Sequence, residues 1–324
     1  MKYFLTGATG FLGNVLALQL LAKGQQVNAV VRNPDKAAEL KRLGASLFPG
    51  DVTDKESMRA AMQGVDGVYH MAAWYKVGAK KNRDQGEKVN VQGSRNVFEL
   101  MKELRIPKGV YTSTLAVNSN THGKLVDETY HFEGKHISEY DRTKAAAHEL
   151  AKKFIADGLP LVIVMPGLIY GPGDTSNLHT SIIDFLKGRL PMMPTQLAMC
   201  GAHVEDIAQA HILAMEKGKI GETYIIAGEY QTFQEAFKLA SQITGKRAPF
   251  SVPYQMANVL AVMARPFDAI LPEIYTSEGL RVTAGVTYIG DNRKAKRELG
   301  YNPRPFRIGW EETLRHEMSR LGMK

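Results

Sequence analysis

The stretch Leu5-Thr6-Gly7-Ala8-Thr9-Gly10-Phe11-Leu12-Gly13 decides the fold. It joins an apolar run at residues 3–6 to an amphipathic segment at residues 12–23, so the sequence predicts a strand, a glycine turn and a helix in that order. Gly7 permits a tight turn, Gly10 lets the backbone approach a pyrophosphate, and Gly13 lets the helix pack closely on the sheet. Because the helix N-terminus also offers unpaired N–H groups to phosphates, this order of elements favours dinucleotide binding over a purely structural turn.

Short apolar runs alternate with amphipathic segments through the first half of the chain, as in βαβ units around a parallel sheet. Strands are expected at residues 3–6, 27–31, 46–48, 67–71, 110–112 and 161–165. Helices are expected at residues 12–23, 35–43, 89–104 and 138–157. This pattern predicts the α/β class with a doubly wound parallel Rossmann sheet.

After Pro166 the sequence pattern changes. It predicts loops that contain Gly and Pro, with isolated helices between them. We therefore expect an NAD(P)-binding Rossmann domain at residues 1–166. Residues 167–324 should form a smaller, mixed, mainly substrate-binding region. One strand-like run in that region, near residues 222–227, is expected to return to the Rossmann sheet.

The composition narrows the choice of partners. The formal charge is +8, but the basic residues are dispersed, and the cluster at residues 292–297 has the apolar spacing of a solvated helix, so we expect no nucleic acid. The glycine turn begins too early for a signal peptide or membrane span, which favours a cytoplasmic protein without a membrane partner. A single cysteine, Cys200, fits a reducing compartment. The histidines lack the spacing of metal ligands, so no metal is expected.

The end of the second strand selects the cofactor, because an acidic residue there binds the ribose of NAD and a basic one binds the 2′-phosphate of NADP. Arg32 occupies this point, and Lys36 adds a second charge nearby. An Arg presents a planar fork of donors that suits phosphate. NADP(H) is therefore favoured, with NAD(H) as the alternative if Asp35 turns back to the ribose.

Tyr140 and Lys144 are four residues apart in an expected helix, so their side chains share one face. Reduction of a carbonyl needs a proton donor, and a neighbouring ammonium lowers the pKa of a phenol toward neutrality. Ser113 and Thr114 follow the fifth strand, at the sheet edge where ligands bind in such folds. The sequence therefore predicts a catalytic site made of Tyr140, Lys144 and a hydroxyl, from Ser113 or Thr114, that orients the substrate.

Taken together, these segments resemble the extended short-chain dehydrogenase/reductase superfamily, also described as the NAD-dependent epimerase/dehydratase family, with dihydroflavonol reductases as the branch most similar. The resemblance covers nearly the whole chain. Gly7, Gly10 and Gly13 match its TGxxGxxG turn, and Tyr140 and Lys144 match its YxxxK motif. It implies further cofactor contacts at Thr9, Phe11, Leu12, Asp51, Val52, Met71, Ala72, Ala73, Asn90, Pro166, Gly167 and Ile169.

By this resemblance Tyr140 is the acid/base group, and Lys144 lowers its pKa and holds the nicotinamide ribose. Counting from Asn118 points to Thr114 as the orienting hydroxyl, and the Thr-Ser-Ser form of dihydroflavonol reductases points to Ser113. Asn118 stands where those reductases place an Asn near the substrate. Relatives pair through helices that would contain Asn96 and Ala147, but monomers also occur among them, so the resemblance leaves both a homodimer and a monomer open for this chain.

The substrate half should separate a reductase from an epimerase. Sugar-nucleotide members commonly carry a basic residue, which grips the diphosphate, at the position of Met199, although Lys187, Arg189 or Arg281 could supply that charge. The apolar stretch at residues 251–272 suits a pocket for an apolar substrate, or a packed helix or dimer face. We therefore expect an NADPH-dependent reductase of a small-molecule aldehyde or ketone. The alternatives are a sugar-nucleotide epimerase or dehydratase with tightly bound NAD, and a non-catalytic NADP-sensing protein.

Overall fold

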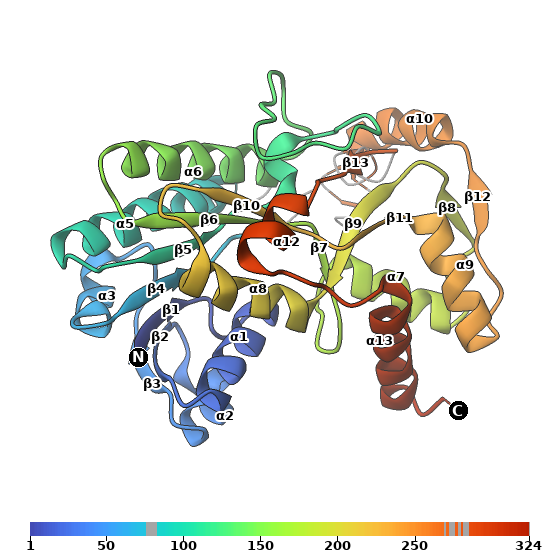
Figure 1. The fold of residues 1–324 in the computed structure, drawn as a ribbon. Coiled ribbons are helices and arrows are strands. Elements are labelled where there is room, and N and C mark those ends of the chain that lie inside the picture. The colour runs from blue at the N-terminus through green and yellow to red at the C-terminus, as the bar shows by residue number, and fades with distance from the viewer. Residues whose placement is uncertain (76–82, 269, 272–275, 278–279, 281–284, 324) are drawn as a thin grey trace.

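A computed structural model describes the chain except residues 76–82, 269, 272–275, 278–279, 281–284 and 324. Its centre is a seven-stranded sheet with the order β10-β6-β5-β4-β1-β2-β3, in which every neighbouring pair is parallel (Figure 1). The strands are β1 (Lys2–Thr6), β2 (Gln26–Val31), β3 (Ser46–Pro49), β4 (Gly67–His70), β5 (Gly109–Thr112), β6 (Leu161–Pro166) and β10 (Thr223–Ile226). The predicted doubly wound Rossmann sheet is confirmed.

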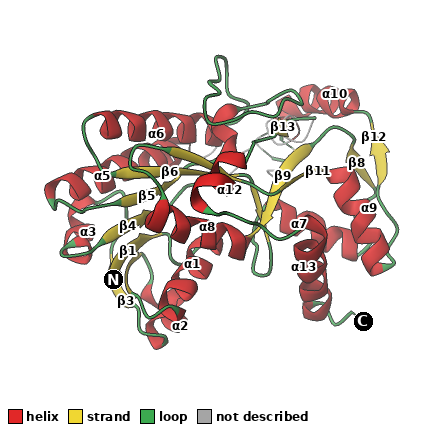
Figure 2. Cartoon of the chain, viewed as in Figure 1, coloured by secondary structure: helices red, strands yellow, loops and turns green. Residues whose placement is uncertain are grey.

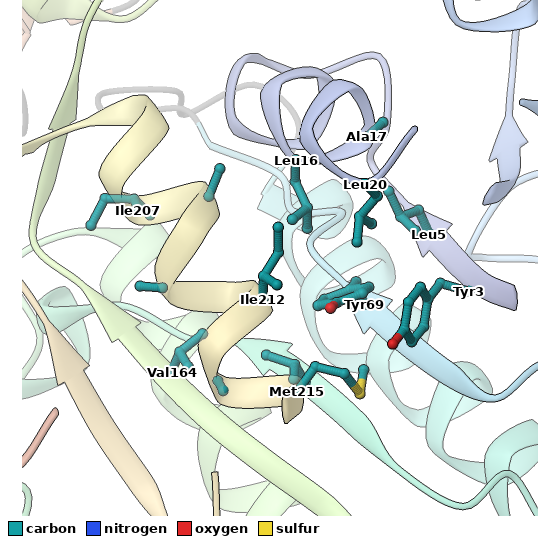
Figure 3. Close-up of a cluster of buried hydrophobic side chains, with 14 of the residues drawn as sticks. Tyr3, Leu5, Leu16, Ala17, Leu20, Tyr69, Val164, Ile207, Ile212 and Met215 are labelled. Carbon is teal, nitrogen blue, oxygen red and sulfur yellow. The ribbon is translucent and has the colours of Figure 1, made fainter. Parts of the chain in front are cut away.

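Helices cover both faces of this sheet (Figure 2). On one face, Leu16 and Leu20 of α1 and Ile207 and Ile212 of α8 pack on buried sheet residues such as Tyr69 (Figure 3). The helices of this half are α1 (Phe11–Ala22), η1 (Pro34–Ala37), α2 (Ala38–Arg42), α3 (Lys55–Met62), α4 (Arg83–Gly86), the π-helix η2 (Glu87–Gln92), α5 (Gly93–Glu103), η3 (Leu115–Asn118) and α6 (Glu139–Ala156), followed later by α8 (Val204–Lys217).

The opposite face carries α3, α5 and α6. Met58 of α3, Phe98 of α5 and Ala147 of α6 are fully buried in one apolar cluster with Phe4 and Ile163 of the sheet. Because α6 lies against this face beside the end of β5, its first turns are placed at the edge where ligands bind in doubly wound sheets.

A second, smaller layer follows β6. The chain crosses at Gly167 into β7 (Leu168–Tyr170), which pairs with β9 (Ala198–His203) in a four-stranded sheet with β11 (Glu229–Thr232) and β13 (Thr287–Tyr288). The remaining elements are α7 (Asn177–Leu186), β8 (Met192–Pro194), α9 (Phe233–Thr244), β12 (Phe250–Val252), α10 (Tyr254–Ala264), η4 (Arg265–Phe267), α12 (Arg293–Leu299) and α13 (Phe306–Arg320). Trp310, Phe237 and Phe185 form their apolar centre.

The strand near residues 222–227 is β10, which pairs in parallel with β6 at the edge of the main sheet. The substrate half of the chain thus contributes to the Rossmann layer. Across the described ranges, none of the helices combines the length and apolarity that crossing a membrane requires.

Candidate functional site

The glycine turn is shaped by close backbone approach. Gly7 has a φ of +76°, and a Cβ there would lie 2.9 Å from the backbone nitrogen of Ala72, so the ends of β1 and β4 meet at this point. A Cβ on Gly13 would collide with the Gly7 carbonyl, so α1 rests directly on the turn. Gly10 is the N-cap of α1 and supplies no side-chain cap. The first N–H groups of α1 are thus left for a ligand, which fits the pyrophosphate of a dinucleotide.

Arg32 follows directly after β2, and its side chain is 81% exposed. Its Nε lies 3.7 Å from Oδ2 of Asp51, while Oδ1 of Asp51 accepts hydrogen bonds from the N–H and hydroxyl of Thr53. Lys36 is also exposed, on η1. Both cations therefore stay accessible to an anionic group at the end of β2, and the hydrogen bonds with Thr53 hold Asp51 next to Arg32.

Asn90 links the segment after β4 to α6. Its Oδ1 accepts the Trp74 N–H at 2.8 Å, and its Nδ2 donates to the Trp74 carbonyl at 3.1 Å and to Oγ1 of Thr143 at 2.9 Å. Three of its four hydrogen-bonding positions are thereby used within the protein. Its predicted contact with the cofactor stays a prediction, as do those of Val52, which is buried, and Ala73, which is exposed.

Lys144 is buried against the end of β5, with only 3% of its surface exposed. Its Nζ donates to the carbonyl of Thr112 at 2.8 Å and to the hydroxyl of Tyr111 at 3.3 Å. Burial lowers the pKa of Lys144 to about 7, because the ammonium has lost most of its hydration. At neutral pH Lys144 is therefore close to its titration point even without a ligand.

Tyr140 lies one helical turn before Lys144. The residue is half-buried, its phenol oxygen is desolvated and hydrogen-bonds Thr114, and its ring contacts Tyr75 edge-on at a centroid distance of 4.8 Å. Burial and the neighbouring Tyr75 hold the pKa of Tyr140 well above its usual 10. In the ligand-free protein the phenol is therefore protonated, and burial outweighs any lowering of its pKa by Lys144.

The two candidate hydroxyls diverge at the end of β5. The Thr114 hydroxyl bonds the Tyr140 phenol and accepts the N–H of Ala116, whereas Oγ of Ser113 lies 2.8 Å from Nδ1 of His148, on α6. Both Ser113 and His148 are buried. The structure thus brings Thr114 to Tyr140 and turns Ser113 away.

Asn118 is the last residue of η3, and its buried Nδ2 has no hydrogen-bond partner among the described residues. It is 4% exposed and lines a cavity of about 370 Å³ between α6 and residues 127–136, whose lining includes His136 and His148 but neither Tyr140 nor Lys144. Its predicted contact with a substrate stays a prediction.

Pro166, Gly167 and Ile169 lie where the chain passes from β6 into β7. A Cβ on Gly167 would collide with the carbonyl of Cys200, so the crossing requires glycine. Cys200 itself is buried on β9. These residues stand at the same strand-end edge as Thr112, since β5 and β6 are parallel neighbours.

The position at which a basic residue would bind a diphosphate carries an uncharged side chain. Met199 is half-buried on β9, opposite Gln231 and Tyr288 of the flanking strands. Lys187 and Arg189 are exposed after α7, and Arg281 lies outside the described residues.

The apolar stretch at residues 251–272 forms β12, α10 and η4, with residues 269 and 272 outside the described part. Its large side chains at Val259, Val262, Met263 and Phe267 are exposed. A pocket lined by them stays a prediction.

The chain is similar in sequence to known proteins of one family. The model of the family described as "NAD dependent epimerase/dehydratase family" matches residues 3–227. The chain belongs to this family. It is 32% identical over 311 residues to a putative dihydroflavonol 4-reductase of Synechocystis, covering 92% of this chain and 89% of the relative. It is also 29% identical over 309 residues to 4-hydroxy-2-methyl-3-oxo-4-farnesyl-3,4-dihydroquinoline-1-oxide ketoreductase of Stigmatella aurantiaca, covering 93% and 92%.

Solved structures have the same fold as this chain. The crystal structure of gox2253 superposes with a TM-score of 0.86 at 30% identity, over 100% of this chain and 99% of that one. MoeE5, solved with UDP-glucose and NAD, shares the fold with a TM-score of 0.79 at 20% identity, over 99% of this chain and 100% of that one. This family member is an NAD(P)-dependent oxidoreductase of the extended short-chain dehydrogenase/reductase type, as the sequence predicts.

Four residues of the site escape the sequence patterns. Tyr111 and Thr112 anchor Lys144, Tyr75 packs on Tyr140, and His70 contacts the end of β1 through Thr6. Tyr111 and His70 look like ordinary strand residues. Only their position at strand ends, next to the expected ligand edge, could have singled them out.

Proposed function

We propose that this protein is an NADPH-dependent reductase that converts an aldehyde or ketone to an alcohol, with Tyr140 as the proton donor. The observation that carries the proposal is the hydrogen bond between Thr114 and the protonated Tyr140 phenol, one helical turn from the buried Lys144. A bound NADPH supplies the hydride when a carbonyl is reduced. The residues of this chain supply the proton and orient the carbonyl.

The protonation states suit reduction. The raised pKa keeps a proton on Tyr140 at neutral pH, so its phenol can donate to the alkoxide that forms as the carbonyl is reduced. The phenolate that remains is stabilised by the Lys144 ammonium, because opposite charges in a dry site attract strongly. Thr114 donates its hydroxyl hydrogen to the substrate oxygen, which fixes the carbonyl next to Tyr140.

Arg32 supports NADPH over NADH. It is exposed at the end of β2, where the 2′-phosphate of NADP binds in Rossmann folds, and Lys36 is nearby. Its contact with Asp51, at 3.7 Å, is long for a charge-assisted hydrogen bond, so a phosphate competes easily for the guanidinium.

The substrate half supports a carbonyl over a sugar nucleotide. Met199 on β9 provides no charge for a diphosphate, and the two relatives described above are named as reductases. A non-catalytic sensor has no need of Tyr140 and Lys144 in a buried, hydrogen-bonded arrangement, which this chain retains.

The test is NADPH oxidation by the purified protein with aldehydes, aromatic ketones and diketones, run beside NADH and sugar nucleotides. Tyr140→Phe is the catalytic variant. Tyr224→Phe is its matched control, since Tyr224 is also a buried tyrosine but lies on β10 and bonds Lys219 and Glu298. We expect turnover with NADPH that is lost in Tyr140→Phe and kept in Tyr224→Phe. Interconversion of a sugar nucleotide without net NADPH oxidation would overturn the proposal.

A further inference from the structure

A chain of buried hydroxyl and imidazole groups connects the glycine turn to Lys144. Oγ1 of Thr6 lies 2.8 Å from Nδ1 of His70, and Nε2 of His70 lies 2.9 Å from Oγ of Ser94. Ser94 hydrogen-bonds Tyr111, whose hydroxyl accepts the Nζ–H of Lys144 at 3.3 Å. None of these five side chains is more than 3% exposed.

The hydrogen atoms at the Thr6 end can be assigned by counting. A hydroxyl has one hydrogen and two acceptor positions. Oγ1 of Thr6 accepts the N–H groups of Met71 and Ala72, each at 3.0 Å, so both acceptor positions are filled. The hydroxyl hydrogen must therefore point to His70, and Nδ1 of His70 is an acceptor. A neutral His70 then carries its hydrogen on Nε2 and donates it to Ser94.

The direction of the remaining bonds follows in the same way. Oγ of Ser94 donates to the carbonyl of Asn90 at 2.6 Å, so toward His70 and Tyr111 it can only accept. Tyr111 therefore donates to Ser94 and turns its lone pairs toward the ammonium of Lys144. The hydrogen bonds from Thr6 to Tyr111 therefore have a single consistent arrangement.

Packing and charge hold His70 in this state. Its ring stacks on Tyr111 at a centroid distance of 5.5 Å and contacts Phe98 edge-on at 5.9 Å, which fixes its orientation. Burial, with a smaller contribution from the nearby Lys144, lowers the pKa of His70 to about 3. His70 therefore stays neutral, and no second cation competes with Lys144 in the site.

We propose that His70 is a positioning residue, which as the neutral Nε2–H tautomer keeps Ser94 and Tyr111 oriented so that Tyr111 supports the Lys144 ammonium. The proposal rests on the function proposed for Lys144. It also ties the position of that lysine to the turn that receives the cofactor, since Thr6 holds the Met71–Ala72 backbone against Gly7. One buried network thereby fixes the position of the glycine turn relative to α6, the helix that carries Tyr140 and Lys144.

The first test needs no substrate. In protein labelled with nitrogen-15 histidine, the signals of His70, assigned by their loss in His70→Gln, should be those of a neutral ring protonated at Nε2 and constant from pH 5 to pH 8. A ring protonated at Nδ1, or one that titrates in this range, would overturn the proposal whether or not a carbonyl is ever turned over.

The second test follows cofactor binding by fluorescence against pH, with whichever of NADPH and NADH binds better. Binding of the anionic cofactor should weaken as Lys144 loses its charge near pH 7. We call this loss of affinity with rising pH the alkaline limb. Tyr111→Phe removes one acceptor of the Lys144 ammonium, so the midpoint of the alkaline limb should move down by about one pH unit. Tyr224→Phe is the matched control, since Tyr224 is likewise a buried strand tyrosine beneath a lysine, Lys294, and it should leave the limb in place.

Two variants of His70 separate the ends of the network. His70→Gln can still donate to Ser94, whereas His70→Asn can accept from Thr6 but leaves Ser94 without its donor. We expect His70→Asn to move the limb as Tyr111→Phe does, and His70→Gln to move it less than half as far. Two outcomes would overturn the proposal and leave His70 with a role in folding only. One is an equal shift of the limb in His70→Gln and His70→Asn. The other is no shift in His70→Asn and Tyr111→Phe relative to Tyr224→Phe.

Discussion

Ser113 and Thr114 are adjacent in sequence, but their hydroxyls have different partners. Thr114 bonds Tyr140, and Ser113 bonds His148. Thr114→Val should therefore lower kcat by about 100-fold, the scale of losing one well-placed group in proton transfer. Ser113→Ala should lower kcat less than tenfold but destabilise the protein by about 1–3 kcal/mol, because Nδ1 of His148 loses its partner. Steady-state kinetics and denaturant titrations measure both, and the reverse order would assign the substrate to Ser113.

Arg32 is the residue on which cofactor choice depends. Arg32→Ala should raise KM for NADPH by about 10- to 100-fold, which corresponds to the loss of a charge-assisted hydrogen bond to phosphate. KM for NADH should change little. Arg42→Ala, an exposed arginine at the end of α2, is the control for a general loss of positive charge. An equal effect on both cofactors would place the 2′-phosphate elsewhere.

Single residues were predictable from the sequence where chemistry and spacing coincide. Tyr140 and Lys144 share a helix face, and Arg32 ends a strand, so each could be found without a structure. Tyr111 and His70 could not, because their roles arise from hydrogen bonds between segments more than twenty residues apart. The choice of Thr114 over Ser113 likewise depends on how the backbone turns after β5.

Among the elements, the six predicted strands agree with the structure within two residues at each end, since buried parallel strands are continuous apolar runs. The helix predicted at residues 89–104 begins as the π-helix η2, which carries Asn90, and that local widening has no signal in apolar spacing. Helix α3 escaped prediction although Asp54 caps it by accepting the N–H groups of Glu56 and Ser57. The short strands β7, β9 and β13 pair with partners far along the chain, so neighbouring residues do not reveal them.

The junction of β1 and α1 leaves no room for a side chain at Gly13. Gly13→Ala places a Cβ against the Gly7 carbonyl, so α1 must shift away from the turn. We expect a loss of stability of about 1–3 kcal/mol and weaker cofactor binding, because overpacking displaces the N–H groups that receive the pyrophosphate. Asn14→Ala, at the next position of the same helix, should fold normally in denaturant titrations. Unchanged cofactor affinity in Gly13→Ala would separate this turn from the cofactor.

For the molecule as a whole, the buried Lys144 makes stability depend on pH. Its pKa falls from the usual 10.5 to about 7 on folding, so between these values the unfolded chain binds a proton that the folded chain does not. The free energy of unfolding should therefore rise with pH across this window. Lys144→Met should lose that slope, and its stability relative to the native protein should be highest at pH 7 or below. If the free energies of unfolding of the two proteins, measured by denaturation, changed equally from pH 7 to pH 10, the burial of this charge would be contradicted.

Net hydride transfer to a carbonyl, with Tyr140 as the proton donor, can be followed with an isotope. NADPH deuterated on the transferred position is incubated with a ketone that the protein turns over, and the product is examined by mass spectrometry. We expect one deuterium on the carbinol carbon of the alcohol for each NADP⁺ formed, and no product with Tyr140→Phe. An alcohol without deuterium, or conversion of a substrate with no NADP⁺ released, would contradict it.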